Sequence, residues 1–143
     1  MKKYIFVIMI LPFIFSCGND EITDDNYTDL IDMKKSPIIT FDESEYNFGT
    51  IIEGAVVTNR FTFTNTGEAT LLISSINASC GCTASDNWSR ETIKPGGKGF
   101  IDATFKSEGF PGDTDKKLTV VSNTFPTNTI IKLKGTVIGP DLQ

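Results

Sequence analysis

The chain has 143 residues, which is enough for one domain of ordinary size, and its 13 basic and 18 acidic residues give a formal net charge of −5. It contains no histidine. The missing imidazole excludes histidine-based acid–base catalysis, Ser-His-Asp and Cys-His nucleophile pairs, and histidine-ligated metal sites. An acidic chain without a basic stripe also argues against nucleic-acid binding.

The first 16 residues have the layout of a secretory signal. Two lysines precede residues 4–15, which are uncharged, mostly apolar and too short a run to cross a bilayer comfortably. The following "IFSC" resembles a bacterial lipobox, in which the signal is cut before the cysteine and the thiol receives a lipid. We predict a signal peptide over residues 1–16 and lipid attachment at Cys17. The alternative is an uncleaved apolar segment with an incidental cysteine.

An acidic segment follows the predicted lipidation site. Residues 18–33 contain six acidic residues and no basic one, with little hydrophobic periodicity. We expect residues 17–35 to be a lipidated cysteine and a solvated tether. Asp20 and Glu21 resemble the tag that exports some Gram-negative lipoproteins to the cell surface. A spacer facing the periplasm is the alternative, so the predicted location is the outer membrane of a Gram-negative envelope, on either side.

Residues 36–138 read as a succession of short strands. In "VVTNRFTFTN", Val57, Phe61 and Phe63 share one parity and polar residues take the other, as in a half-buried strand. The same alternation recurs up to "NTIIKLKGTV", and Gly/Pro turns separate the runs. At the end of "FTNTG", the polar Asn65-Thr66-Gly67 closes a strand, and Gly67 can adopt a positive φ without penalty. The pattern predicts an all-β domain over 36–143, an antiparallel β-sandwich of about seven strands.

Five motifs in this order carry a family resemblance: "FDESEYNFGTIIEG", "FTFTNTGEATLLI", "SCGCT", "IKPGGKGFIDATF" and "LKGTV". Together they resemble a family of uncharacterised bacterial proteins known as domain of unknown function fifteen-seventy-three, from about Ile39 to Val137. The resemblance implies an immunoglobulin-like sandwich similar to the domains of major sperm protein and of ciliary proteins. Such relatives mostly act as binding or scaffold modules, and the family has no agreed activity.

The Cys80-Gly81-Cys82 sequence has three interpretations. The cysteines can form a structural pair, oxidised or not; they can exchange thiols with a substrate; or, as thiolates, they can hold a copper(I) ion. On an extended strand their Cα atoms would lie ~6.5–7 Å apart, near the limit for a disulfide, unless Gly81 makes a turn. Zinc would need two further ligands, so we predict no metal site within the chain, with copper at Cys80 and Cys82 as the weaker alternative.

Trp88 lies in "SDNWSR", which is either an exposed loop with an aromatic contact residue or a cover on the end of the sandwich. We predict a non-enzymatic, lipid-anchored envelope module that binds or scaffolds another envelope protein, along a strand edge or on the loops around Cys80–Arg90. We predict no catalytic residue and no cofactor, and a small-molecule ligand stays open. The alternative is a thiol-redox or copper-handling accessory protein that uses Cys80 and Cys82.

Overall fold

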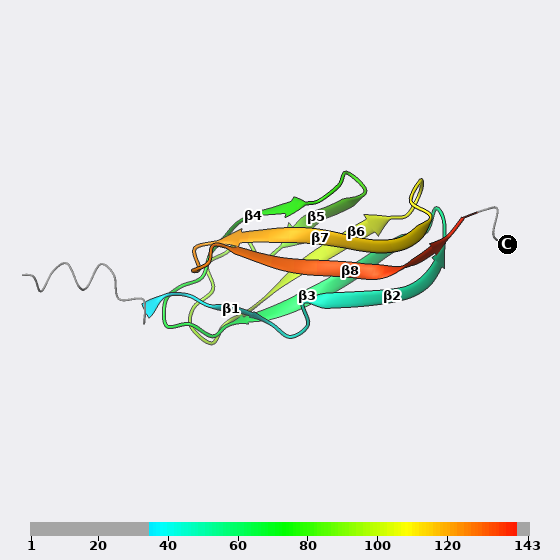
Figure 1. The fold of residues 1–143 in the computed structure, drawn as a ribbon. Helices are drawn as coiled ribbons and strands as arrows, with labels where there is room; N and C mark the ends of the chain where they lie inside the picture. The colour runs from blue at the N-terminus through cyan, green and yellow to red at the C-terminus, as the bar shows by residue number, and fades with distance from the viewer. Residues whose placement is uncertain (1–34, 140–143) are drawn as a thin grey trace, which may run out of the picture. The chain divides into compact units, whose positions relative to one another are not determined.

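The computed structural model describes residues 35–139, which form two packed four-stranded β-sheets (Figure 1). One sheet has the strand order β1-β3-β6-β5 and the other β2-β8-β7-β4. This confirms the all-β sandwich. The predicted signal peptide, Cys17 and the acidic tether up to residue 34 lie outside the described residues. The strands are β1 (Ile39–Phe41), β2 (Glu45–Ile52), β3 (Val56–Asn65), β4 (Ile73–Ala78), β5 (Thr83–Trp88), β6 (Lys98–Lys106), β7 (Gly112–Ser122) and β8 (Asn128–Ile138).

Two details of the prediction are corrected. The described residues contain eight strands, because "TASDNW" forms the additional strand β5. The sandwich is also not wholly antiparallel, since β2 pairs in parallel with β8. The chain places β1 in one sheet and β2 in the other, so that each of these first strands lies at a sheet edge. Because the chain crosses from β1 in one sheet to β2 in the other without forming a hairpin, β2 can run parallel to the last strand, β8.

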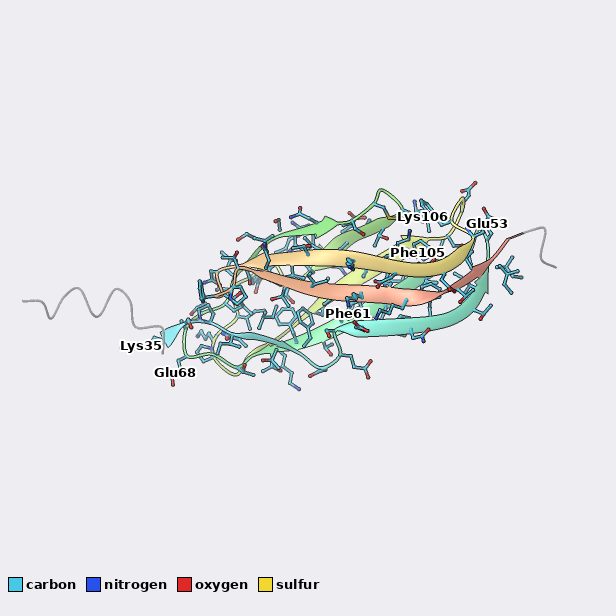
Figure 2. The ribbon with its side chains drawn as sticks, viewed as in Figure 1. Lys35, Glu53, Phe61, Glu68, Phe105 and Lys106 are labelled. Atoms are coloured by element: carbon cyan, nitrogen blue, oxygen red, sulfur yellow. A yellow bond between two sulfur atoms is a disulfide. The ribbon has the colours of Figure 1, made fainter. Side chains whose placement is uncertain are left out.

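The core follows from the alternation of the strands. Inward-facing side chains from both sheets are almost fully buried, and Figure 2 shows Phe61 and Phe105 between the sheets. Burial of such side chains is the main favourable term in folding. The predicted inward parities of β3, β6, β7 and β8 are confirmed by buried Phe61, Phe63, Ile101, Ala103, Phe105, Leu118, Val120, Ile131, Leu133 and Val137.

Asn65 organises the end of the sandwich at which the domain begins. Its side chain is fully buried, and its Nδ2 donates to the carbonyl oxygens of Ala69 (2.8 Å) and Ile93 (2.9 Å). Its Oδ1 accepts hydrogen bonds from the backbone nitrogens of Gly67 (3.1 Å) and Ile38 (3.3 Å). One amide therefore joins the first residues of the domain to the connection between β5 and β6.

Gly67 closes its strand without the positive φ that glycine can adopt, since it is not among the glycines with positive φ. A Cβ atom at Gly67 would instead collide with the backbone of Ser36, Pro37 and Ile38. A glycine is needed at this position because two backbone segments approach each other too closely for any side chain to fit between them.

The parallel β2–β8 pair carries an ion-pair cluster on its outer face. The Glu45 carboxylate accepts hydrogen bonds from Lys132 Nζ (2.8 Å) and Lys134 Nζ (2.7 Å). The hydrogen bond from Lys132, followed by that from Lys134, lowers the pKa of Glu45 to about 2 from 4.5. Since the cluster is exposed, solvent screens it and its contribution to stability is small.

We expect part of the stability to be lost as the pH falls from about 4.5 towards about 2, because protonation of Glu45 breaks both ion pairs. A depressed carboxyl pKa stabilises the folded state above the unfolded value and loses that effect below it. Urea midpoints measured across this range should show the decrease in the native protein. Glu45→Gln should abolish this part of the pH dependence, whereas Glu43→Gln, at an exposed carboxylate without an ion pair in the described domain, should retain it.

None of the described residues belongs to a helix with the length and apolarity needed to cross a lipid bilayer.

Candidate functional site

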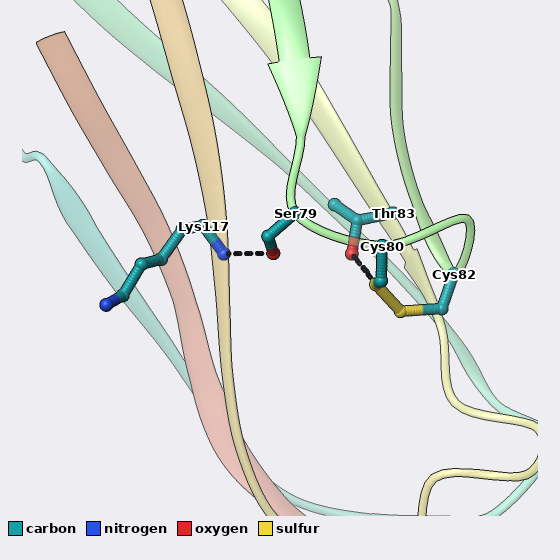
Figure 3. Close-up of a disulfide and its surroundings, with 5 residues drawn as sticks. All are labelled: Ser79, Cys80, Cys82, Thr83 and Lys117. Atoms are coloured by element: carbon teal, nitrogen blue, oxygen red, sulfur yellow. Dashed lines mark hydrogen bonds between the residues drawn. A yellow bond between two sulfur atoms is a disulfide. The ribbon is translucent and has the colours of Figure 1, made fainter.

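Cys80 and Cys82 form a disulfide in the turn between β4 and β5 (Figure 3). The Thr83 backbone nitrogen donates to the Cys80 carbonyl oxygen (3.2 Å), which closes the turn and brings the two Cα atoms to 5.3 Å. This separation is well within disulfide range, unlike that of an extended strand. Cys82 is 8% exposed and Cys80 is partly buried. Cys80 is therefore the more exposed residue of the pair.

Thr83 is the polar neighbour of both sulfur atoms. Its hydroxyl oxygen lies 3.5 Å from Cys80 Sγ and 3.7 Å from Cys82 Sγ. A hydroxyl that donates to a thiolate stabilises the charged form. The disulfide itself has no thiolate with which to bind a soft metal, so copper binding would require the reduced pair. Within residues 35–139, no three cysteine or carboxylate side chains cluster in a way that could hold a metal ion.

Removing the disulfide should cost little stability. It closes a loop of only three residues, and the chain-entropy relation gives about 1–2 kcal/mol for so short a loop. Cys80→Ala/Cys82→Ala should therefore lower the free energy of unfolding by about that amount in urea titrations. Reductant should lower the midpoint of the native protein and leave the variant unchanged. A loss of 4 kcal/mol or more, on the order of a long-loop disulfide, would contradict this view of the turn.

Trp88 closes β5 and faces Ile101 of β6 in the strand register. It is partly buried against the hydrophobic core, and the Arg90 guanidinium carbon lies 3.8 Å from the centre of its ring. Its indole nitrogen is buried without a hydrogen-bond partner among the described residues. The loop interpretation is thus wrong: Trp88 belongs to a strand, with one side on the core and the other beneath Arg90.

A groove adjoins Trp88 at the connection between β5 and β6. It has a volume of about 590 Å³ and combines aromatic, aliphatic and cationic walls. Glu91 is the acidic residue of the described lining. We call this feature the Trp88 groove, and its principal lining residues are Trp88, Arg90, Ile93, Lys94, Lys98 and Phe100.

The cations of the Trp88 groove have no acidic partners in the described domain. Arg90, Lys94 and Lys98 are exposed, and none of the ion pairs within residues 35–139 involves them. Arg90 makes only a long hydrogen bond to the Asp86 carbonyl oxygen (3.4 Å) besides its stacking on Trp88. Its guanidinium edge is therefore available to a carboxylate, for which this planar fork is well suited.

The neighbouring carboxylate of Asp102 is already neutralised. Arg60 donates to both of its oxygens, at 2.7 and 2.8 Å, and Asn87 donates to one at 2.7 Å. The hydrogen bond from Arg60 is the main reason why the pKa of Asp102 lies below its usual value. Arg60 also stacks on Phe100, 4.2 Å from the ring centre. Asp102 therefore does not offset the positive charge of the groove.

The disulfide and Trp88 do not form one site. They flank opposite ends of β5, a strand of six residues that spans about 17–20 Å. The predicted contact region around Cys80–Arg90 is thus divided into two separate features. Sequence reasoning also missed Lys94, Lys98 and Phe100 as neighbours of Trp88. The pairing of β5 with β6 brings these residues close to Trp88, and the sequence did not indicate that β5 is a strand.

Comparison with solved structures shows a similar fold within proteins of different kinds. A Porphyromonas gingivalis W83 protein of unknown function matches 73% of this chain at 15% identity and a TM-score of 0.61, and the chain covers 48% of its length. The PapD-like domain 7 of human CEP192 matches 73% of the chain and 88% of that domain, at 12% identity and a TM-score of 0.58. The secreted serine protease VesC of Vibrio cholerae matches 80% of the chain over 25% of its own length, at 14% identity and a TM-score of 0.54.

These likenesses confirm an immunoglobulin-like fold, and their identities are too low to say more. A sequence comparison with curated proteins found no match. Residues 39–137, by contrast, match a family model over most of the domain, and this range agrees with the motifs noted in the sequence. The chain belongs to the family described as "Protein of unknown function (DUF1573)".

Proposed function

We propose that this protein is a non-enzymatic binding module of a Gram-negative cell envelope, anchored by a lipid on Cys17, and that it binds another envelope protein through the Trp88 groove. The observation that carries the proposal is the groove itself. An aromatic residue and three cations without acidic partners surround a concavity on an otherwise regular sandwich. Aromatic residues and arginine are the side chains that dominate binding hot spots.

The groove is a better docking site than the adjacent strand edge. β5 is the edge of its sheet and pairs only with β6 in the described domain. It is short, and its pairing with β6 shifts register between Ala84 and Asn87. Short, irregular edge strands disfavour the addition of a further strand. A partner is therefore better held by side chains in the groove than by backbone pairing.

The expected partner presents carboxylates next to an apolar group. Arg90, Lys94 and Lys98 would receive the carboxylates, while the ring edges of Trp88 and Phe100 that Arg90 and Arg60 leave uncovered would contact the apolar group. The chemistry of the chain supports binding over catalysis, since it has no histidine. Glu45 and Asp102, the described carboxylates with lowered pKa, are both held by cations on the outside of the sandwich.

Site-specific photo-crosslinking in the native envelope tests the groove. A crosslinking amino acid at Ser89 or Lys94 should give one dominant adduct with an envelope protein, and the same amino acid at Lys117 on β7 should give none. Arg90→Glu should reduce the adduct from Ser89, whereas Cys80→Ser/Cys82→Ser should leave it unchanged. No adduct from either groove position, or equal adducts from Lys117, would refute this function.

Metabolic labelling tests the anchor. An alkyne-bearing fatty acid should label the protein and place it in the membrane fraction, and Cys17→Ser should remove the label and release the protein. Cys80→Ser/Cys82→Ser provides the matched control, because these cysteines lie in the folded domain. A labelled Cys17→Ser variant would contradict lipid attachment at this residue.

Thiol exchange is the second candidate, favoured by the partly exposed Cys80 and the Thr83 hydroxyl beside its sulfur. An incoming thiolate would attack Cys80 Sγ, form a mixed disulfide there and release Cys82 as a thiolate that Thr83 can stabilise. Alkylation and mass spectrometry at defined glutathione potentials should then give a potential within the range of exchange proteins. A pair that resists the whole glutathione range would be structural, and copper bound stoichiometrically to the reduced protein would favour metal handling.

A further inference from the structure

We propose that the end of the sandwich at which the domain begins docks on the lipid bilayer, with Phe125 and Ile38 inserted at the level of the lipid headgroups. The inference rests on the lipid anchor of the proposed function, and it adds a membrane contact on the folded domain itself. We call the contact surface the Phe125 patch, which consists of Ile38, Phe125 and Pro126. It is separate from the Trp88 groove, because the described linings of the two hollows share no residue.

The Phe125 patch exposes large apolar side chains from two segments of the chain. Phe125 is 79% exposed, more than any other large apolar residue of the described domain, and Ile38 is 50% exposed. Both residues line one small hollow of about 120 Å³, together with Pro126. Single exposed apolar residues are ordinary on a protein surface, whereas apolar residues that converge from distant segments indicate a contact surface.

Hydrogen bonds hold the connection between β7 and β8 in the shape that exposes Phe125. The Ser122 backbone nitrogen donates to the Thr127 carbonyl oxygen (2.9 Å), and the Thr124 hydroxyl donates to the Pro126 carbonyl oxygen (2.7 Å). Ser122 and Thr124 are buried, and their hydroxyl oxygens lie 2.9 Å apart. The polar side chains of the turn are therefore satisfied within the protein, while the aromatic ring faces outward.

The segments that form the Phe125 patch carry no charge. Residues 36–41 and 118–131 contain no acidic or basic side chain. The opposite end of the sandwich also exposes two apolar residues, Ile52 (58%) and Val56 (61%), but Glu53 lies between them in the sequence. Moving a carboxylate out of water is costly, so lipid insertion is favoured at the Phe125 patch and disfavoured at the opposite end.

The chain enters the domain at the end that carries the patch. Lys35, the first described residue, lies there together with Glu68 (Figure 2). Residues 18–34, which number 17, separate Lys35 from Cys17 and span at most about 60 Å. A connection this short keeps the domain at an effective concentration in the millimolar range beside the bilayer, so a small apolar contact suffices for docking.

A tryptophan sensor tests the docking. Trp88→Phe removes the only native tryptophan, and Phe125→Trp then places a single indole on the patch. The lipidated full chain would be reconstituted into phosphatidylcholine vesicles with and without brominated acyl chains, which quench tryptophan on contact. The sensor emission should fall by roughly twofold in brominated vesicles, because the ring lies at the boundary between headgroups and acyl chains. The effect should persist at about 1 M salt, where ionic attraction to a membrane is screened.

A sensor at the opposite end is the matched control. Val56→Trp in the Trp88→Phe background occupies a similarly exposed position and should not be quenched by brominated lipid. Adding Ile38→Ser to the Phe125 sensor should weaken its quenching, whereas adding Ile52→Ser should not. No quenching at position 125, or equal quenching of the two sensors, would overturn the proposal. Emission of a lipid-free Cys17→Ser sensor that shifts with protein concentration would also overturn it, because the patch would then pair with a second copy.

The fatty-acid labelling experiment separates this inference from the anchor on which it rests. A label at Cys17 combined with an unquenched Phe125 sensor would refute the docking and leave the anchor standing. A quenched sensor on a chain that takes up no label would refute the anchor and leave the membrane contact of the patch standing. Crosslinking from Ser89 in the native chain tests the Trp88 groove independently of both.

Discussion

Replacing Asn65 by aspartate is expected to lower the free energy of unfolding by about 4 kcal/mol at neutral pH. The side chain keeps its size but loses Nδ2, which donates to the carbonyl oxygens of Ala69 and Ile93. A buried carboxylate would then face two carbonyl oxygens without a donor. Each lost hydrogen bond costs about 1–3 kcal/mol when a buried group is left unsatisfied, and charge increases the cost.

The pH dependence of this loss identifies its cause. Burial raises the pKa of a carboxyl group, so the aspartate variant should regain stability as the pH falls through its raised folded-state pKa, where the neutral acid can donate again, and the recovery should be complete near the unfolded value of about 3.9. Urea titrations of native and Asn65→Asp protein, followed through Trp88 fluorescence, provide the measurement. Asn77→Asp, at an exposed position of β4, should change stability by less than about 0.5 kcal/mol. Equal losses at pH 3 and pH 7 would refute the electrostatic explanation.

Phe105→Ala is expected to cost about 3–5 kcal/mol, because it removes a fully buried ring between the sheets. The ring of Phe105 stacks on Phe48, with centroids 5.8 Å apart, and contacts Phe110 at 6.4 Å. These rings come from three different segments of the chain. Alanine would therefore leave a cavity that no single neighbour can fill.

The same strand supplies the control for Phe105. Thr104 points outward, where its hydroxyl hydrogen-bonds to that of Thr58 (3.0 Å), and Thr104→Ala should cost less than about 1 kcal/mol. Phe105→Leu should lie between the two, because it keeps most of the buried carbon. Thermal or urea unfolding of the three variants would show the ranking. A Phe105→Ala protein as stable as Thr104→Ala would mean that the two sheets do not pack as described.

The core residues were predictable because alternate residues of a strand point to opposite faces of the sheet, so the apolar positions mark the buried face. In β3 the sequence alternates Phe61 and Phe63 with polar residues, and one alternating strand is sufficient to mark its buried face. β5 escaped prediction because its residues, "TASDNW", contain few β-branched or aromatic side chains. It is a strand because β6 offers it a partner, which is tertiary information. The parallel pairing of β2 with β8 likewise cannot be predicted from the local residue pattern of either strand.

The candidate site was predictable only as separate residues. Trp88 and the two cysteines attracted attention by their chemistry, but their relation depends on which strand runs between them. The closeness of Lys98 and Phe100 to Trp88 follows from the β5–β6 register, in which Trp88 is opposite Ile101. A strand register that shifts between Ala84 and Asn87 cannot be derived from hydrophobic alternation. Gly67 shows the same limit, since its neighbour Ser36 is distant in sequence.

The strand arrangement gives the domain two distinct poles. Lys35 and Glu68 lie at the pole where the domain begins, and Glu53 and Lys106 lie at the opposite one (Figure 2). Ile138, at the end of β8, accepts a hydrogen bond from Glu53, and Cys82 accepts one from Lys106, so the disulfide shares the second pole with the last strand. A bulky group attached at Ile138 would therefore lie at the same pole as the disulfide and away from Trp88. Labels intended to follow docking at the Trp88 groove belong at this second pole, whereas a protein used to study the chemistry of the disulfide is best left unlabelled there.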